Sequence, residues 1–462
     1  MMIAEGLKSA WWLIVALGVL VTIHELGHYL AARWCGVKVL RFSVGFGRPL
    51  WMRKDRHGTE WAIAMLPLGG YVRMLGEHDL VDRKTEVSEA ERAQSHDHKP
   101  VGQRMLISFA GPFANLVLCV ALLWLMFVIG RPDYAPVVGE AQGIAASAGL
   151  QRGDTLLSVG DRATPTWTEA SMALLTSAID RGRVPVEIRT AGGLETRRTL
   201  DFSRLPAGND LGNAIEHIGI VPRHQLQVPV VETVAPGSAA DGVLRPGDRI
   251  LAVGGTPLAY WDELPPLVAR LGEAGGGPVE IERDGARRTL TLAPRLGQRP
   301  KQAGGGEAWL LGIAAPREVG KAPKDALLRY GPLQAVPAAF RETWYQLGEL
   351  GGMFKRAFDG RLAVKDTVSG PIGIARAANA YAKNGLAWYI SLLALLSLSL
   401  GVLNLLPVPV LDGGHLLYYL IELLKGRPLS DRAMAAGQYV GLALLLGLMG
   451  LAFFNDLQGL IR

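Results

Sequence analysis

The sequence has few cysteines and no concentrated patch of charge of one sign. Cys35 and Cys119 are the only two thiols among 462 residues. Cys35 follows one apolar run and Cys119 lies within another, so we expect both to be packing thiols and predict no structural disulfide. The formal net charge is +6, but the cations are scattered and form no dense basic stripe. The sequence therefore predicts no nucleic-acid partner.

Charge is absent altogether from several long apolar runs. Hydrophobic residues make up 49% of the chain, a share that soluble proteins also reach, so the position of these residues decides more than their number. A helix that crosses a bilayer core requires about 20 predominantly apolar residues. Four segments are near or above that length and are predicted to span a membrane: Leu7–Leu30, Met105–Gly130, Leu386–Leu406 and Ala433–Phe454.

The first apolar run contains a metal-protease motif, His24-Glu25-Leu26-Gly27-His28. On a helix, residues at i and i+4 share a face, so both imidazoles can reach one Zn²⁺, and Glu25 beside them can take a proton from an attacking water. A cleaved signal peptide does not carry such a motif. The alternative is a soluble amphipathic helix with a coincidental H-x-x-x-H. We favour a functional site, because ionisable groups are costly at membrane depth unless they serve a function.

Lysine and arginine are distributed unevenly between the predicted loops. The 31–104 segment holds 13 of them, whereas residues 1–10 contain only Lys8 and the residues after the last span only Arg462. Since cytoplasmic loops carry the excess of cations, we predict that 31–104 and 407–432 face the cytoplasm. Both termini and residues 131–385 then face outward, to the periplasm of a Gram-negative host. If the first helix enters hydrocarbon near Ala10, the motif lies roughly 20–27 Å further along it, so the site is expected inside the membrane near its cytoplasmic side.

Residues 41–77, after the first span, have short apolar stretches that are broken by glycine pairs and rich in β-forming residues. This pattern predicts β-hairpins rather than a helix. Such strands can lie against the membrane only if their backbone is paired or faces a wet cavity. The polar residues 78–100 are predicted to form a loop. Within it, His96 and His98 flank Asp97 in what we interpret as a solvated turn, with a second metal site as the alternative.

The outward segment contains an internal repeat. Four landmarks recur at a constant offset of 94 residues: Gly153-Asp154 with Gly247-Asp248, Val159-Gly160 with Val253-Gly254, Trp167 with Trp261, and Glu169 with Glu263. A constant offset indicates two copies of one module of about 90 residues, predicted at 131–223 and 224–316. The glycine–aspartate and strand pattern resembles the PDZ fold, whose members bind a peptide, often a C-terminus, as an added strand. Two inert spacer domains are the alternative.

Residues 317–385 are predicted to be a connector that contains amphipathic helices. Large apolar side chains recur at helical spacing within 324–358. Helices of this kind lie on a membrane surface or line the catalytic bundle, although ordinary core helices fit the same pattern. The two halves of the membrane unit are accordingly predicted at 1–130 and 386–462.

The third span ends in a proline-rich run that offers a third metal ligand. Pro407 and Pro409 cannot continue a regular helix, so the backbone must open there. Asp412 follows at membrane depth beside two glycines, and a catalytic metal requires a third protein ligand. The alternative for Asp412 is a helix N-cap, and His415 is the rival ligand, which we interpret as a packing residue. Asn404 can offer its amide to a substrate backbone or cap the carbonyls that the prolines free.

With these residues in view, the chain resembles the site-2 family of intramembrane zinc metalloproteases. The likeness rests on HELGH in the first span, the run from Asn404 to His415 in the third, and the two PDZ-like repeats between them. Further segments that resemble the family are GFG (45–47), PLGGYV (67–72), AGPFAN (110–115) and SGPIGIA (369–375). The resemblance implies one Zn²⁺ per chain, with His24, His28 and Asp412 as ligands, Glu25 as the base and Asn404 as a substrate-positioning residue.

The predicted fold is a multi-span α-helical membrane protein with four transmembrane helices, membrane-associated β-hairpins and two tandem PDZ-like α+β domains. The resemblance implies cleavage of single-span membrane proteins within the bilayer of the bacterial inner membrane. Expected substrates are an anti-sigma factor that a first cut has trimmed, in a stress response, and signal-peptide remnants. Expected partners also include membrane lipid and peptide C-termini at the PDZ-like pair, which would hinder substrates that still carry bulky external domains.

Two alternatives from other classes fit part of the pattern. A membrane scaffold with a structural metal would use the PDZ-like modules alone, but an open HExxH with an intact Glu25 speaks against it. A zinc transporter would require several intramembrane ligands along a path. The second and fourth spans offer only Asn115 and Gln438 for that purpose, so we favour the protease.

Overall fold

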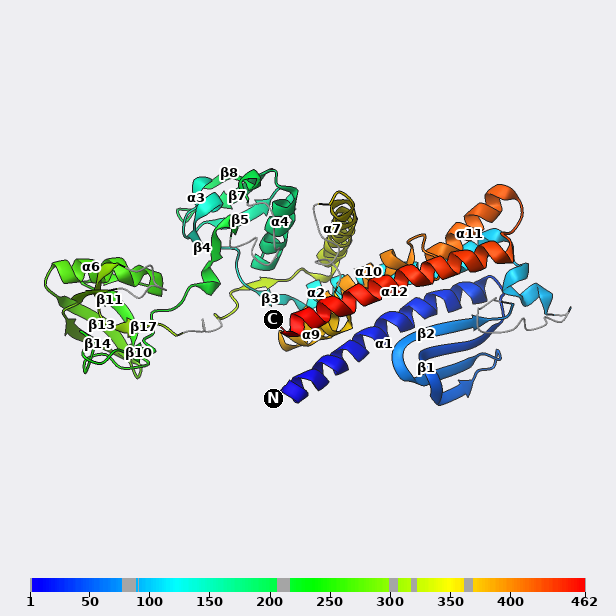
Figure 1. Cartoon of the computed structure of the whole chain (residues 1–462), viewed down its shortest axis with the longest axis horizontal. Coiled ribbons are helices and arrows are strands. Elements are labelled where there is room, and N and C mark those ends of the chain that lie inside the picture. Colours follow the sequence, from blue (N-terminus) through cyan, green and yellow to red (C-terminus); the bar gives the residue numbers. More distant parts are fainter. Residues whose placement is uncertain are drawn as a thin grey trace. The chain divides into compact units, whose positions relative to one another are not determined.

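The computed structural model describes residues 2–76, 89, 91–205, 217–298, 306–316, 322–360 and 369–461. The chain divides into two compact units, which Figure 1 draws coloured along the sequence. The first comprises Met1–Arg131 with Leu328–Arg462, and the second comprises Pro132–Leu327. Most of the predicted polar loop at 78–100 lies outside the described residues, as do 206–216 and parts of the 317–385 connector.

Four long apolar helices dominate the first unit (Figure 1): α1 (Met2–Trp34), α2 (Val101–Ile129), α10 (Leu386–Asn404) and α12 (Asp431–Ile461). Each contains a stretch long and apolar enough to cross a membrane. Helix is the form that such a stretch must take in hydrocarbon, because it pairs every backbone group within the segment. The prediction of four helices long and apolar enough to span a membrane is confirmed.

Small residues allow α2 to pack closely against both α1 and α10. A Cβ on Gly27 of α1 would lie 2.3 Å from the carbonyl oxygen of Ala110, and one on Gly401 of α10 would lie 3.0 Å from that of Pro112. Helices in membranes associate largely through such close backbone approaches. Apolar side chains of α2 and α10, including Leu123 and Leu398, complete a buried cluster. Helix α2 is therefore the element on which the other helices of the site are placed.

Strands β1 (Val39–Lys54) and β2 (Glu60–Met74) form an antiparallel sheet beside α1 (Figure 1). Both strands bend, so that Phe42 pairs with Val72 and also with Trp61, and Trp61 pairs in addition with Arg53. Four strand segments therefore lie side by side, although only two strands are present. The bend in β1 falls where Gly45 adopts a φ of +92°, a conformation that glycine reaches without steric cost.

Helix α9 (Pro371–Lys383) is joined to the first and last helices of the chain through part-buried polar contacts. The backbone N–H groups of Ile372 and Gly373 donate to the Asp456 carboxylate of α12 at 2.8 and 3.1 Å. At the other end, Asn379 donates to Glu5 of α1 at 3.0 Å. Because the first N–H groups of a helix have no partner within it, Asp456 acts as the N-terminal cap of α9.

Helix α7 (Pro332–Phe358) has small buried residues and large exposed ones. Ala335, Ala338 and Ala339 are buried where α7 packs on α2. Its exposed large apolar side chains are Leu333, Val336, Phe340, Trp344, Met353, Phe354 and Phe358. An exposed apolar face of this size fits contact with lipid, in agreement with the amphipathic pattern of the sequence.

Helix α11 (Asp412–Lys425) packs against α2. Arg104 of α2 donates to Glu422 of α11 at 2.6 Å and lies over the ring of Tyr419. Two short 3-10 helices, η1 (Arg92–Gln94) and η2 (His96–His98), precede α2. The two contacts of Arg104 hold α11, whose first residue is Asp412, against the membrane helix α2.

The second unit contains two modules with the same sheet order. The elements of the first are β4 (Val138–Ala141), α3 (Gly143–Ser147), β5 (Thr155–Val159), β6 (Arg162–Ala163), α4 (Trp167–Asp180), β7 (Arg183–Arg189), β8 (Glu195–Asp201), η3 (Phe202–Arg204), β9 (Ile220–Pro222) and η5 (Arg223–Gln225). Its strands pair in the order β6-β5-β7-β8, with β4 pairing β9 separately. Its own buried core includes Leu156, Ile188 and Phe202.

The elements of the second module are β10 (Thr233–Val234), β11 (Arg249–Val253), β12 (Thr256–Pro257), η6 (Trp261–Glu263), α6 (Leu264–Glu273), β13 (Gly277–Arg283), β14 (Ala286–Leu292), β15 (Arg295–Gln298), β16 (Glu307–Leu310) and β17 (Ile313–Ala314). The order β12-β11-β13-β14 repeats that of the first module, and β10 pairs β17. Strands β3 (Arg131–Asp133) and β18 (Ala326–Leu328) stand at the chain junctions between the units.

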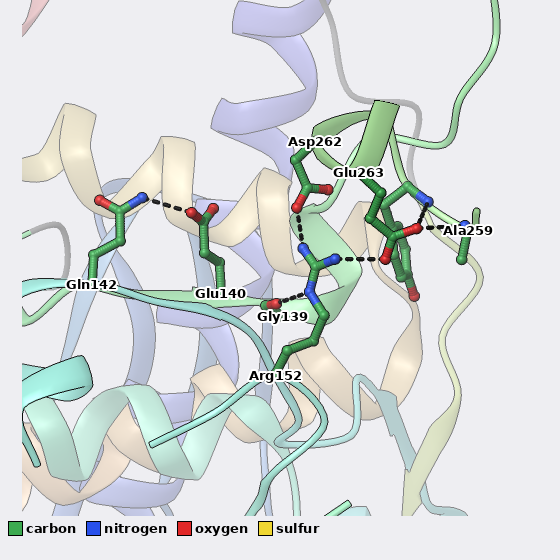
Figure 2. Close-up of polar contacts among 8 residues, drawn as sticks. Gly139, Glu140, Gln142, Arg152, Ala259, Asp262 and Glu263 are labelled. Atoms are coloured by element: carbon green, nitrogen blue, oxygen red, sulfur yellow. Dashed lines mark hydrogen bonds and ion pairs between the residues drawn. The ribbon is translucent and has the colours of Figure 1, made fainter. Parts of the chain in front are cut away.

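One arginine links the two modules within this unit (Figure 2). Arg152 of the first module donates to the Gly139 carbonyl at 2.6 Å and to Glu263 of the second module at 2.6 Å, and it also pairs with Asp262. Glu263 accepts a further bond from the N–H of Ala259 at 2.7 Å, which orients its carboxylate. The planar guanidinium is suited to this multidentate pairing.

Candidate metal centre

The two histidines of the HELGH motif lie on one face of α1. Both are 8% exposed. Their ring centroids are 4.9 Å apart, and the Nε2 atom of His24 is 3.3 Å from that of His28. This is the arrangement expected of residues separated by one helical turn. The two Nε2 atoms therefore face a common point.

Asp412 reaches the same point from the end of the third span. Helix α10 ends at Asn404, as the following prolines predict, and Asp412 begins α11. Its Oδ2 atom is 3.1 Å from Nε2 of His24, and its Oδ1 atom is 3.4 Å from Nε2 of His28. The two glycines after it are required sterically, because a Cβ on Gly413 would lie 2.2 Å from the Leu406 carbonyl oxygen.

These three side chains fit a catalytic metal. Within the part of the chain that the structure describes, they form the one group of three His, Cys, Asp or Glu residues whose ligand atoms lie together, all within 4.8 Å. Tetrahedral Zn²⁺ with bonds of about 2.0–2.1 Å holds its ligand atoms about 3.3 Å apart. The observed spacings of 3.1–3.4 Å agree with that value. Two imidazoles and a carboxylate also form a donor set that leaves a fourth position open.

Glu25 lies beside this group and against the sheet. A Cβ on Gly70 of β2 would lie 3.1 Å from Cγ of Glu25 and 2.9 Å from Cγ1 of Val21. Strand β2 thus runs along α1 at the level of the candidate centre. Glu25 is half-buried, follows the ligand candidate His24 directly in the sequence, and is not one of the three grouped residues.

Two residues that the sequence suggested for the site lie apart from the three-residue group. The ring centroid of His415 is 6.4 Å from that of Tyr418, and His415 is not one of the grouped ligands. Asn404 is the last residue of α10 and is half-buried. Its side chain makes no hydrogen bond to any described residue, and it is not joined to the three-residue group.

Sequence reasoning did not assign a role to α2 in the site, and the structure places it there. Nδ1 of His28 is 2.8 Å from the Ile107 carbonyl oxygen, and Nδ1 of His24 is 3.2 Å from the Asn115 amide. Gly111 lies between these two positions, against the His28 ring. The AGPFAN segment (110–115) carried the available signal, because a polar asparagine is costly within an apolar span.

Comparison with known proteins identifies the family of the chain. The sequence matches peptidase family M50 over residues 12–448. The chain belongs to this family. It is 49% identical over 457 residues to a Xylella fastidiosa (strain Temecula1) protein named "Putative zinc metalloprotease", which covers 98% of this chain and 100% of the relative. It is also 40% identical over 452 residues to the "Regulator of sigma-E protease RseP" of Escherichia coli K12, covering 97% of this chain and 98% of the relative.

Family membership confirms the resemblance to site-2 proteases and the assignment as a metalloprotease. The relative from Yersinia pestis, named "Protease RseP", is 40% identical over 454 residues, 97% of this chain and 98% of its own length. Zinc is accordingly the cofactor, and the four apolar helices make the chain an integral membrane metalloprotease. These findings overrule the scaffold and transporter alternatives.

Proposed function

We propose that His24, His28 and Asp412 hold one Zn²⁺ per chain and that Glu25 is the catalytic base of peptide hydrolysis. The observation that carries this proposal is the convergence of three ligand atoms from α1 and α11 within 4.8 Å, with Glu25 adjacent. When bound there, Zn²⁺ supplies a Lewis acid that polarises a peptide carbonyl and makes water more acidic. Glu25 takes the proton of the attacking water and returns it to the leaving amine.

The proposed substrates are transmembrane segments of single-span membrane proteins. A membrane helix hides its carbonyl groups in its own hydrogen bonds, so the scissile segment must become extended before attack. Residues 70–72 of β2 support this step. They pair on one side with β1, face no further strand of the sheet on the other side among the described residues, and begin at Gly70 beside Glu25. An extended substrate can add to this edge as a further strand, and Asn404 would hold its backbone.

The biological substrate that best fits the comparisons is an anti-sigma factor already trimmed by a first cut, in a stress response. Two relatives named for sigma-E regulation, from Escherichia coli and Salmonella typhimurium, are similar over 97% of this chain. Signal-peptide remnants belong to the same chemical class, because they are short apolar helices released from larger proteins. Both fit regulated proteolysis within the bacterial inner membrane.

The two modules of the second unit are proposed to be PDZ-like domains that bind peptide C-termini. Each has a short strand, β9 or β17, that pairs with one neighbouring strand, and each has one longer helix, α4 or α6. PDZ domains bind a peptide as an added strand. The cation distribution supports placing the modules and both termini in the periplasm, with the metal near the cytoplasmic side.

Substituting Glu25 by glutamine tests the proposed chemistry. Glu25→Gln keeps the side-chain volume but removes the base, so the purified protein should retain one Zn²⁺ per chain and lose cleavage of a single-span reporter by at least about a hundredfold. Alanine at His24, His28 and Asp412 together should instead remove the metal. A Glu25→Gln variant that cleaves normally would refute the role of Glu25. A triple alanine variant that keeps its zinc would refute the ligand set.

A further inference from the structure

Asn115 is a fully buried polar side chain in the middle of α2. Its residue has an exposed fraction of 0%. Its Nδ2 atom lies 3.2 Å from Nδ1 of His24, and its Oδ1 atom is buried without a hydrogen-bond partner. The backbone carbonyl of Asn115 accepts a bond from the Ser397 hydroxyl of α10 at 2.8 Å, which fixes this turn of α2. A buried amide oxygen without a hydrogen-bond partner is rare and requires an explanation.

His28 shows which form of imidazole the site requires. Its Nδ1 atom lies 2.8 Å from the carbonyl oxygen of Ile107, and a carbonyl can only accept a hydrogen bond. The proton of His28 is therefore on Nδ1. Nε2 is left with its lone pair directed at Asp412 and His24, as a metal ligand must be.

The same requirement applies to His24 and determines what Asn115 must do. To act as a zinc ligand, Nε2 of His24, which faces Asp412, must offer its lone pair, so Nδ1 must carry the proton and needs an acceptor. The oxygen and nitrogen of an asparagine amide are nearly equal in size, and a half-turn of the amide exchanges them. That turn places Oδ1 of Asn115 opposite Nδ1 of His24. The turn gives Oδ1 of Asn115 a hydrogen-bond donor. It also removes the arrangement in which two N–H donors, Nδ2 of Asn115 and Nδ1 of His24, face each other.

We propose that Asn115 is a positioning residue that accepts a hydrogen bond from Nδ1 of His24 and so fixes the tautomer and orientation of this zinc ligand. The inference rests on the proposed ligand set. It assigns to α2 the support of both imidazoles: the Ile107 carbonyl holds His28 and the Asn115 amide holds His24. These two groups are separated by about two helical turns, so they lie on the same face of α2.

Two substitutions at residue 115 separate hydrogen bonding from packing. Leucine preserves the approximate volume and apolar fit but offers no acceptor, whereas aspartate presents an acceptor oxygen in either orientation. Removing the outer partner of a metal-bound histidine weakens metal binding by about 10–100-fold. Asn379→Leu is the matched control, because Asn379 is also a buried membrane-unit asparagine, at 6% exposure, but donates to Glu5 instead of a metal ligand.

The test measures Zn²⁺ affinity of the purified full-length chain in detergent, by competition with a chromogenic chelator. Asn115→Leu should bind Zn²⁺ about 10–100-fold more weakly, Asn115→Asp should remain within a few-fold of the unsubstituted chain, and Asn379→Leu should be unchanged. The proposal is overturned by normal affinity in Asn115→Leu. It is equally overturned if Asn379→Leu or Asn115→Asp loses as much affinity as Asn115→Leu, because packing alone would then account for the effect.

The triple alanine variant of His24, His28 and Asp412 distinguishes this inference from the function on which it rests. If that variant retains Zn²⁺, the ligand set is wrong. If it loses Zn²⁺ while Asn115→Leu binds normally, the ligand set stands and only the role of Asn115 is wrong.

Discussion

A Cβ atom on residue 111 would lie 2.2 Å from Nε2 of His28, so this imidazole can occupy its position only because residue 111 is glycine. The relationship joins the second span directly to a ligand atom of the first. It also explains physically why a glycine stands beside Pro112 within an otherwise apolar helix.

Gly111→Ala should therefore weaken metal binding while leaving the fold largely intact. The methyl group would displace the His28 ring, and we expect Zn²⁺ affinity to fall by at least about tenfold together with cleavage. Gly102→Ala is the matched control in the same helix, because a Cβ there meets nothing within 4 Å. Chelator competition on both variants measures the difference, and equal zinc affinity in the two would contradict the structure.

Proline substitutions along β2 should reveal where the substrate binds. Proline removes a backbone donor, and one lost hydrogen bond is worth roughly 1 kcal/mol, so variants within 70–72 should cleave a reporter about three- to tenfold more slowly. Met52, in the segment of β1 on the far edge of the same sheet, supplies the control position. Zinc content should be unchanged in all variants. Normal cleavage by every variant of 70–72 would rule out strand addition at this edge.

Removing the second unit should relax the choice of substrate. If the PDZ-like pair hinders bulky external domains, a chain lacking residues 140–316 should cleave an untrimmed single-span substrate, which the full chain leaves intact. The trimmed substrate serves as control and should be cleaved at a similar rate by both. The measurement is the appearance of the cytoplasmic fragment in cells. Continued resistance of the untrimmed substrate, with the trimmed one still cleaved, would exclude this role.

The second module should lose stability in acid through one buried carboxylate. Burial raises the pKa of Asp248, but hydrogen bonds from Arg283 at 2.7 Å and from the N–H of Arg245 outweigh it, so the pKa is lowered overall. The folded state therefore gains stability above the unfolded pKa of about 3.9 and loses it as the pH falls through the lower folded value.

Asp248→Asn should remove this pH dependence and weaken the module at neutral pH. Limited proteolysis of the intact protein, followed within residues 231–292, measures both effects. Asp284→Asn is the control, because Asp284 is an exposed turn residue of the same module whose φ of +51° asparagine also tolerates. If Asp248→Asn resists protease as the unsubstituted chain does between pH 3 and 7, the ion pair contributes nothing measurable.

The membrane helices and the three grouped side chains could be predicted because their patterns are local. The charge-free run before His24 and the i, i+4 spacing specify a membrane helix and a shared face without knowledge of any neighbour. Pro407 and Pro409 likewise require the chain to leave α10 before Asp412. The exact helix bounds were less accessible, since α1 continues to Trp34 beyond the predicted end at Leu30.

The role of α2 could not be predicted, because it depends on which helices touch. Asn115 reads as an isolated polar residue until Gly27 and Ala110 are seen to bring α1 and α2 together. The double pairing of Phe42 in the sheet was hidden for a similar reason. Glycines in 41–77 indicate turns, but which segments become neighbours depends on how the strands bend.

The cap that Asp456 provides for α9 also has a consequence for biosynthesis. Its carboxylate accepts from the N–H of Ile372, 84 residues earlier in the chain. During synthesis α9 therefore precedes its partner in α12, and its first amides lack this carboxylate cap until residue 456 has been added. The cap of α9 can form only after translation has passed residue 456. A nascent chain arrested before that point lacks the Asp456 carboxylate.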